Sequence, residues 1–248
     1  KTFENTQTQD RDLIYVEKTH YSLFENLTLT RGQHSLIGFQ NSTYNVVRNN
    51  ILRNEWQKAV GIASPDGAYT NLQGMNVFEN NKIFGSRPAI APGFTGKGAM
   101  GIYLNQKGNI IRRNEIYDNT NFGILIDGNN ALGNSSVNNN KIYHNTIYRN
   151  GGNGNNYTES AGITLTNFGT NLSMGSNVIK NNIVSENNNY SLYFRSNVAG
   201  LDNNLTSGNC IYRPAGANSS IFLNGVGANT LGFFQTAYAA IISNNIEA

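Results

Sequence analysis

Hydrophobic and polar residues repeat along this chain in a fixed order. An apolar residue, two variable residues, an asparagine, one further residue and a second apolar residue recur six times. Self-similarity at a period of about 20–50 residues is typical of stacked repeat architectures. The six copies are Val46–Ile51, Phe78–Ile83, Ile111–Ile116, Ile142–Ile147, Val178–Ile183 and, more weakly, Thr206–Ile211, and their asparagines are 28 to 36 residues apart.

Each repeat also contains three short apolar segments with the character of β-strands. In the third repeat, Ile102 and Leu104 alternate with Tyr103 and Asn105, so the two pairs lie on opposite faces of a strand. Three strands per repeat predict an all-β fold, a parallel β-helix solenoid of about seven to eight turns with strands stacked at about 4.8 Å. The leading inward residues of the first strand in each turn are expected to be Ile14, Ile37, Ile62, Ile102, Ile124, Ile163, Leu192 and Ile221.

The repeated asparagine is expected at a tight corner between the second and third strands. Asparagine tolerates the left-handed backbone conformation that a sharp corner requires. Amides at equivalent corners can also hydrogen-bond to one another along the axis, as they do in stacked sheets. The pattern therefore predicts one structural ladder, formed by Asn49, Asn81, Asn114, Asn145, Asn181 and Asn209.

The ends of the chain depart from the repeat. We expect a single β-helix domain over 1–248, with repeats over 13–225 and a C-terminal cap over 226–248. Thr230 is a candidate N-cap for a short helix in that cap, because a solenoid must cover its last open turn. The start of the chain shows no comparable cap, and Lys1 is not an initiator methionine, so the sequence is expected to be part of a longer chain.

Composition narrows the choice of partners. Asparagine is abundant, at 44 residues, and only 13% of residues are charged, so neutral polar side chains must form much of the exterior. The formal net charge of +3 comes from scattered lysines and arginines without a basic stripe, which argues against nucleic acid as a partner. No apolar run approaches the ~18 residues of a membrane span. The single cysteine, Cys210, excludes an internal disulfide and is expected to be a buried structural thiol.

The Asn-x-Ile corners and Gly-Ile strands, such as Gly101-Ile102 and Gly123-Ile124, resemble those of the right-handed parallel β-helix superfamily, the pectate-lyase-like group with NosD-type repeats. The resemblance covers roughly residues 13–225 and implies a secreted or cell-surface protein. It does not choose an activity, because the superfamily includes polysaccharide lyases, glycoside hydrolases, uronan epimerases, phage tailspikes, adhesins and copper-site assembly proteins. The Asp-Pro-His-Glu tetrapeptide of alginate epimerases and the paired aspartates of polygalacturonases are absent.

The resemblance also implies a substrate groove along the first strand of each turn. Long connections do cluster on both sides of that strand, for example over 84–100 and 128–140. Sites favour loops held on a rigid scaffold. The side chains expected to point outward there are Tyr15, Glu17, Gly38, Gln40, Ala63, Pro65, Tyr103, Asn105, Leu125, Asp127, Thr164, Thr166, Tyr193 and Arg195.

From this face and its loops we predict two sets of site residues. Tyr103 and Tyr193 offer flat surfaces for sugar rings, and Arg195 is expected about 10 Å from Asp127, two strands away, where it suits a second sugar carboxylate. The predicted substrate-binding residues are Tyr103, Asn105, Thr166, Tyr193, Arg195 and Glu159, and the predicted catalytic residues are Lys97, Arg87 and Asp127.

Two reactions suit these residues. A lyase needs a base for the proton α to a uronate carboxylate and a cation for the enolate-like intermediate, and Lys97 or Arg87 could supply either. A hydrolase needs two carboxylates at about 5–5.5 Å or 6.5–9.5 Å, for which Asp127 and Glu159 are candidates. No cofactor is evident, no residue is assigned to a metal, and calcium stays open because single carboxylates with carbonyl oxygens can hold it.

Each candidate also has a structural interpretation. Asp127-Gly128 suits a turn, the tyrosines suit any solvated strand, and His34 and His144 are expected to be structural. Two functions therefore stay open. One is a β-helix that engages polysaccharide and cleaves acidic glycans by elimination. The other is a non-catalytic carbohydrate-binding, adhesin or structural module of a larger surface protein.

Overall fold

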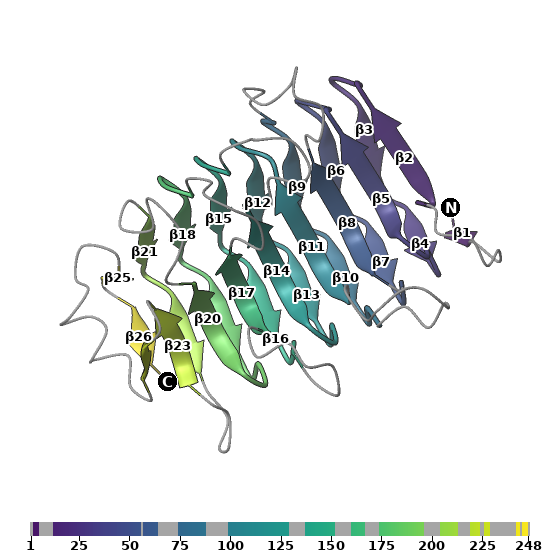
Figure 1. The fold of residues 1–248 in the computed structure, drawn as a ribbon. Coiled ribbons are helices and arrows are strands. Elements are labelled where there is room, and N and C mark those ends of the chain that lie inside the picture. The colour runs from purple at the N-terminus through teal and green to yellow at the C-terminus, as the bar shows by residue number, and fades with distance from the viewer. Residues whose placement is uncertain are drawn as a thin grey trace.

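The computed structural model is a parallel β-helix in which the chain winds through three sheets (Figure 1). The strand pairs within these sheets are parallel, except that Val226–Ala228 runs antiparallel to Ser219–Leu223 at the end of one sheet. The structure describes residues 2–4, 12–55, 57–63, 74–87, 99–128, 137–151, 160–166, 174–195, 204–212, 219–223, 226–228, 242–243 and 245–247. Within these ranges there is no helix long and apolar enough to cross a membrane.

Each turn visits the sheets in the order I, II and III. Sheet I contains β2 (Ile14–Glu17), β5 (Ser35–Gln40), β8 (Lys58–Ala63), β11 (Met100–Asn105), β14 (Phe122–Asp127), β17 (Ala161–Thr166), β20 (Tyr190–Phe194), β23 (Ser219–Leu223) and β24 (Val226–Ala228). Sheet II contains β3 (Leu23–Glu25), β6 (Val46–Arg48), β9 (Val77–Glu79), β12 (Ile110–Arg112), β15 (Lys141–Tyr143), β18 (Val178–Lys180), β21 (Leu205–Ser207) and β25 (Ile242–Ser243). Sheet III contains β1 (Thr2–Glu4), β4 (Thr28–Thr30), β7 (Ile51–Arg53), β10 (Lys82–Phe84), β13 (Glu115–Tyr117), β16 (Thr146–Tyr148), β19 (Ile183–Ser185), β22 (Cys210–Tyr212) and β26 (Ile246–Glu247).

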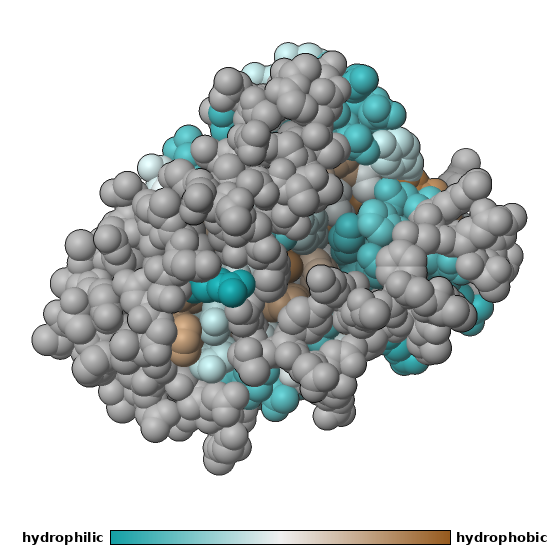
Figure 2. All heavy atoms as spheres, viewed as in Figure 1, coloured by the Kyte–Doolittle hydropathy of each residue, from teal (hydrophilic) through white to brown (hydrophobic). Residues whose placement is uncertain are grey.

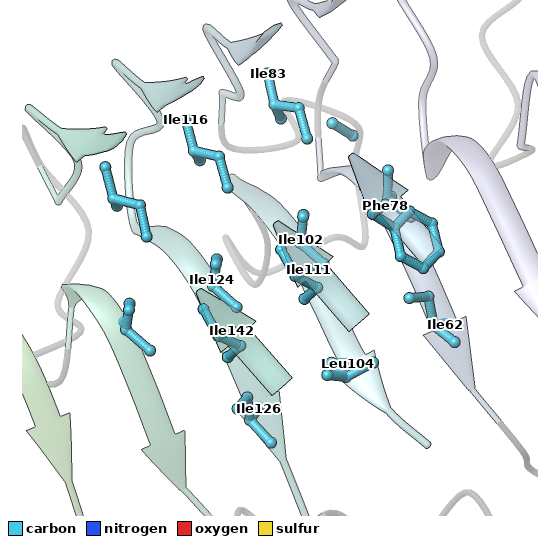
Figure 3. Packing of buried hydrophobic residues seen from close by; sticks show 14 of the residues in the cluster. Ile62, Phe78, Ile83, Ile102, Leu104, Ile111, Ile116, Ile124, Ile126 and Ile142 are labelled. Carbon is cyan, nitrogen blue, oxygen red and sulfur yellow. The ribbon is translucent and has the colours of Figure 1, made fainter. Parts of the chain in front are cut away.

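The interior is a set of aliphatic columns that run along the axis (Figure 3). Ile102 lies beside Ile124, and Leu104 lies beside Ile126, because β11 and β14 pair in register. All four side chains are fully buried. A single turn could not bury its own apolar face, so the stack supplies the core that the repeat requires.

The predicted register is wrong by two residues in one turn. Val60, and not Ile62, pairs with Ile37 and Ile102, whereas Ile62 pairs with Leu104. Both residues of β8 are apolar and both face inward, so the local pattern did not distinguish them. The outward residues of β8 are consequently Gly61 and Ala63 instead of Ala63 and Pro65, and Pro65 lies outside the described residues.

The structure contains three asparagine ladders, one at each corner, where the sequence pattern predicted one. The ladder between sheets II and III runs through amide-to-amide hydrogen bonds of 2.8–3.1 Å. Its members are Asn50, Asn81, Asn114, Asn145, Asn182, Asn209 and Asn245. The ladder between sheets I and II consists of Asn45, Asn76, Asn109, Asn140, Asn177 and Asn204.

Asn49 and Asn181 are therefore not ladder residues. Each lies one position before a ladder asparagine, is exposed, and has a positive φ of 56° or 55°. We expected one residue to adopt the left-handed conformation and also to supply the ladder amide. Two consecutive residues divide these roles: the first adopts the positive φ, and the second supplies the amide. His144 shows the same division, because its φ of 57° makes the corner and Asn145 supplies the ladder amide.

The third ladder, between sheets III and I, explains the glycines of the Gly-Ile strands. Asn119, Asn150 and Asn187 form it. A Cβ on Gly123 would lie 2.5 Å from the carbonyl oxygen of Gly162 and 3.0 Å from Nδ2 of Asn150. The glycine thus leaves space for the ladder amide and for the neighbouring backbone. In the two preceding turns this corner carries Glu55 and Ser86 instead of asparagine.

Two further expectations concern the C-terminal part of the chain. Cys210 is free but only partly buried, since it begins β22 and faces outward instead of into the core. The expected capping helix falls on residues 229–241, which lie outside the described residues. Near them, β24 pairs antiparallel with β23 at the last position of sheet I.

Candidate functional site

The outer face of sheet I carries six of the predicted groove residues in one column, together with Gly61 and Phe222, which were not predicted. Tyr15, Gly38, Gly61, Tyr103, Leu125, Thr164, Tyr193 and Phe222 lie in register on successive strands. Figure 2 shows the molecule from the same side as Figure 1, with hydrophilic residues visible at the N-terminal turns. The column changes character along the axis, and this change separates two regions of the face.

The central region of this face is buried. Tyr103 is 9% exposed, Asp127 is 3% exposed, and Asn105 and Thr166 are fully buried. Met100, Tyr103, Phe122 and Leu125 form a hydrophobic cluster separate from the interior core. These predicted groove residues therefore do not present a solvent-exposed surface in this structure, although Asp127 does pair with Thr166 as predicted.

The polar groups in this region bind one another. The Tyr103 hydroxyl donates to Oδ2 of Asp127 at 3.1 Å, and the Asn105 amide donates to the Asp127 carbonyl oxygen at 2.5 Å. Burial, together with the negative charge of Asp127, raises the pKa of Tyr103 well above its usual value. Tyr103 therefore stays a protonated donor, and Asp127 serves as its acceptor.

The C-terminal end of the face is aromatic. Tyr193 is 7% exposed and stacks on Phe222 with ring centroids 4.6 Å apart. Arg195 lies two strands from Asp127, as predicted, and its backbone amide donates to Leu165. Tyr193 stacks on a neighbouring ring at this end of the face, where it was expected to offer a flat surface to a sugar ring.

The remaining predicted residues lie apart from this face or outside the described residues. Arg87 follows β10, is exposed, and its backbone amide donates to the Glu55 carbonyl oxygen at 2.8 Å. The structure does not bring it together with Asp127 through any recorded contact. Lys97 and Glu159 lie outside the described residues.

A pocket opens at the N-terminal turns of the same face. It lies where the register column carries Gly38 and Gly61, and Tyr15, His34, Lys58 and Tyr103 contribute to its lining. Its cavity volume is about 180 Å³, which suits one small unit of a ligand more than a large ligand, since drug-sized pockets begin near 300 Å³. This pocket is the candidate functional site.

A chain of three titratable groups crosses the pocket. Oδ1 of Asp12 is 2.7 Å from Nδ1 of His34, and Nε2 of His34 is 2.9 Å from Nζ of Lys58. A lysine ammonium can only donate hydrogen bonds, so Nε2 of His34 accepts from it. The His34 proton is then on Nδ1, where it is donated to Asp12.

The charge of Asp12 fits this arrangement. Burial of its side chain raises the pKa, but the hydrogen bonds from His34 and Ser35 and the positive charge of Lys58 lower it. The pKa of Asp12 is therefore lowered, and the carboxylate is ionised near neutral pH. An ionised acceptor fixes both the tautomer and the orientation of the imidazole ring.

Two glycines make room for these side chains. A Cβ on Gly38 would lie 2.0 Å from Oδ2 of Asp12, and a Cβ on Gly61 would lie 3.2 Å from Cδ of Lys58. The missing side chains let Asp12 and Lys58 lie against the sheet. The Lys58 ammonium reaches the ring of Tyr103, at 5.1 Å from the centroid, where a cation–π contact is favourable.

Further polar groups border the pocket. Tyr15 is half exposed, and its hydroxyl donates to Oε1 of Gln40. Both residues keep hydrogen-bonding capacity at the solvent side of the cavity. Among the residues whose positions are described, no group of three or more histidine, cysteine, aspartate or glutamate side chains is arranged to hold a metal ion.

No sequence pattern predicted Asp12, His34 and Lys58 as site residues. His34 was expected to be structural, and Asp12 lies just before the first recognisable strand. The register between strands would have identified them. Ile14 pairs with Ile37, and Ser35 pairs with Lys58, so residues at or just before the starts of β2, β5 and β8 lie side by side. The Gly38 and Gly61 column that opens the pocket became visible only after the register of β8 was known.

Comparisons with known proteins agree with the fold. The family described as "Right handed beta helix region" matches residues 2–168, and no curated protein matches the chain. A mutant of the periplasmic alginate epimerase AlgG is 17% identical, with a TM-score of 0.53 over 81% of this chain and 37% of that chain. A tailspike mutant of E. coli bacteriophage HK620 is 17% identical, with a TM-score of 0.60 over 82% of this chain and 35% of that chain.

Other solved structures extend the comparison. A second HK620 tailspike mutant, in complex with a pentasaccharide, is 15% identical, with a TM-score of 0.58 over 82% of this chain and 35% of that chain. The Dettilon tailspike is 12% identical, with a TM-score of 0.57 over 90% of this chain and 47% of that chain. At these identities the likeness shows the fold alone. The chain spans less than half the length of each of these proteins.

Proposed function

The chain belongs to the right-handed β-helix family, and we propose that it engages an acidic polysaccharide outside the cell or at its surface, through the pocket at the N-terminal turns of sheet I. The observation that carries the proposal is the Asp12–His34–Lys58 chain, which places a cation and an oriented imidazole in a cavity about the size of one sugar unit. The alginate epimerase and the pentasaccharide-bound tailspike, which share the fold, act on or bind saccharides and add support.

Lys58 is the group that selects acidic sugars. Its ammonium can donate a charge-assisted hydrogen bond to a uronate carboxylate, which is stronger than a bond between neutral groups. Tyr15 and Gln40 border the cavity with hydroxyl and amide groups suited to sugar hydroxyls. A neutral sugar could not accept such a charge-assisted hydrogen bond from Lys58, so the proposed pocket favours acidic units.

The reaction these groups support is β-elimination. A base removes the proton on the carbon next to the carboxylate, and the electron pair forms a double bond. The bond to the glycosidic oxygen breaks, and that oxygen takes a proton from water and leaves as a hydroxyl. His34, oriented by Asp12, is the base in this proposal, and Lys58 stabilises the charge that develops on the carboxylate. His34 and Lys58 thus take the roles first assigned to Lys97 and Arg87.

A non-catalytic binding module is the second candidate. One observation favours it: in this structure the Nε2 lone pair of His34 accepts the hydrogen bond from Lys58, so the base is occupied. Such a module would bind acidic glycans through Lys58 without cleaving them. The two candidates share the ligand and differ in the chemistry.

The test is incubation with polygalacturonate, alginate and a neutral galactan, with and without calcium, while ultraviolet absorbance and new reducing ends are followed. Unsaturated product from acidic substrates alone, abolished in His34→Gln, is expected for a lyase. Binding of acidic glycans without product would favour the module, and absence of both binding and product would overturn the proposal. Lys82→Met is the matched control, because Lys82 is an exposed lysine that pairs with Glu115 on sheet III.

A further inference from the structure

We infer that Lys58 holds His34 in a resting state, and that an anionic ligand frees the Nε2 lone pair of His34 by drawing the Lys58 ammonium to itself. The inference rests on the proposed function, since it assigns a control step to the same pocket. It makes Lys58 a positioning residue for His34 in the free protein and a ligand-binding residue in the complex.

The free protein leaves no lone pair on the imidazole for a substrate. Nδ1 of His34 donates to Asp12 at 2.7 Å, and Nε2 accepts from Lys58 at 2.9 Å. A neutral imidazole has one acceptor nitrogen, so the bond to Lys58 uses the position that a base requires. His34 can take a proton from a ligand only after Lys58 leaves Nε2.

Lys58 can make this move without disturbing the sheet. Its side chain lies over Gly61, where a Cβ would be 3.2 Å from Cδ and 3.8 Å from Nζ, so the glycine leaves space beside the lysine side chain. The ammonium also lies over the Tyr103 ring, which attracts a cation without fixing one direction for its hydrogen bonds. A carboxylate is a stronger acceptor for an ammonium than a neutral imidazole is, so an acidic ligand competes well for it.

His34 cannot follow Lys58. The short bond to the lowered-pKa carboxylate of Asp12 holds the ring, and Asp12 itself occupies the space left by Gly38. The Lys58 side chain therefore moves, and the His34 imidazole stays in place. Ligand charge would then both select the substrate and release the base, so neutral sugars would neither bind well nor activate His34.

The first test needs no saccharide. Diethyl pyrocarbonate acylates an imidazole nitrogen that has an available lone pair, and peptide mass spectrometry reports each histidine separately. In Lys58→Met the acylation rate of His34 is expected to rise about tenfold, the factor that one lost hydrogen bond of ordinary strength provides. His144, whose Nε2 is 3.1 Å from Nδ2 of Asn181, is the internal reference and should not change.

Two controls make that result specific. Lys82→Met should leave the His34 rate at the wild-type value, and thermal unfolding will show that each variant is folded. Lys58→Leu, which also lacks a hydrogen-bond donor, is the second variant if Lys58→Met is unstable. An equal His34 rate in wild type and in a folded Lys58 variant would overturn the inference.

The second test follows His34 during binding. Nitrogen-15 spectra of the imidazole are recorded while trigalacturonate, or neutral galactotriose as control, is added to the wild-type protein. Trigalacturonate should shift the Nε2 resonance along the binding curve, and galactotriose should not. Binding of trigalacturonate without any change at Nε2 would overturn the inference and leave the proposed function intact. If no acidic saccharide binds, the proposed function fails, and the Lys58→Met experiment alone decides whether Lys58 blocks His34.

Discussion

Two regions of the same sheet face differ in one column of residues. At the N-terminal turns the column reads Tyr15, Gly38 and Gly61, and a pocket with an ionised chain of side chains opens there. At the central turns it continues with Tyr103 and Leu125, which are buried in a hydrophobic cluster. The strands pair in register in both regions, and at the N-terminal turns two successive glycines of the column leave room for the pocket. Two consecutive glycines in a solenoid column are therefore a signal for a site.

The largest expected effect contrasts two glycines. Gly123→Ala should lower the free energy of unfolding by about 3 kcal/mol, because its Cβ would lie 2.5 Å from a backbone oxygen and the core is already filled. Gly61→Ala should cost less than about 1 kcal/mol, because the Cβ would meet only the ends of Ser35 and Lys58. Urea unfolding of both variants measures the difference, and similar losses would show that the two glycines serve the same purpose.

Removal of the pocket cation should have the next largest effect. Lys58→Met is expected to weaken binding of trigalacturonate by about 10- to 100-fold, since a hydrogen bond to a charged group contributes about 1.5–3 kcal/mol. Isothermal titration calorimetry measures the change. Arg195→Met, which removes a cation at the far end of the same face, is the matched control and is expected to change binding by less than twofold. A larger loss of affinity in Arg195→Met than in Lys58→Met would indicate that the ligand binds at the far end of the face.

Tyr103→Phe should show whether Tyr103, in the central region, contributes to stability or to ligand binding. The variant loses the hydroxyl donor to Asp127 but keeps the ring over which Lys58 lies. We expect a loss of about 1–2 kcal/mol in stability with trigalacturonate affinity unchanged within about twofold. Thermal unfolding and calorimetry on one preparation check both parts. A large loss of affinity with unchanged stability would return Tyr103 to the predicted role of a sugar platform.

The smallest and most pH-dependent change in stability is expected for Glu55, at the corner before β8. Glu55 is fully buried, its carboxyl oxygens have no hydrogen-bond partner, and burial raises its pKa well above the usual value. A raised pKa in the folded state means that Glu55 favours folding below its unfolded pKa of about 4.3, and that this contribution is lost as the pH rises through the folded value. Glu55→Gln should remove this dependence.

The measurement for Glu55 is urea unfolding at several pH values between 4 and 8. The difference in stability, Glu55→Gln minus wild type, should become more positive as the pH rises. Asn119→Asp, at the equivalent corner two turns later, is the matched variant that introduces an acid into an intact ladder, and it should be destabilising at neutral pH. A pH-independent difference for Glu55→Gln would show that Glu55 does not carry a raised pKa.

The fold could be predicted from the sequence because the period and the strand alternation are properties of neighbouring residues. The repeat spacing predicted a parallel β-helix, and the structure has it, with eight parallel strands in sheet I. The errors occurred where neighbouring residues are chemically alike. Asn49 and Asn50 are adjacent asparagines just before the apolar pair Ile51 and Leu52, so the pattern selected the corner residue instead of the ladder residue. Val60 and Ile62 caused the register error for the same reason.

The candidate site could be predicted only in its location on the molecule. The outer face of the first strand was expected from the resemblance, but the predicted residues of that face are mostly buried, whereas Asp12, His34 and Lys58 line its pocket. These three residues lie at or just before strand starts in three successive turns, where no local pattern marks them. The register between turns decides that these three side chains lie close together.

The sequence by itself determined the repeat, the inward aliphatic columns and the presence of corner asparagines, because each follows from residues close together in the chain and from the need of every turn to bury one face. Only the tertiary structure decided which asparagines hydrogen-bond, which side chains of the outer face are covered, and which distant groups share a pocket. Stacking converts residues 20 to 40 positions apart into neighbours about 4.8 Å apart, so a shift of one or two residues in register changes every such contact.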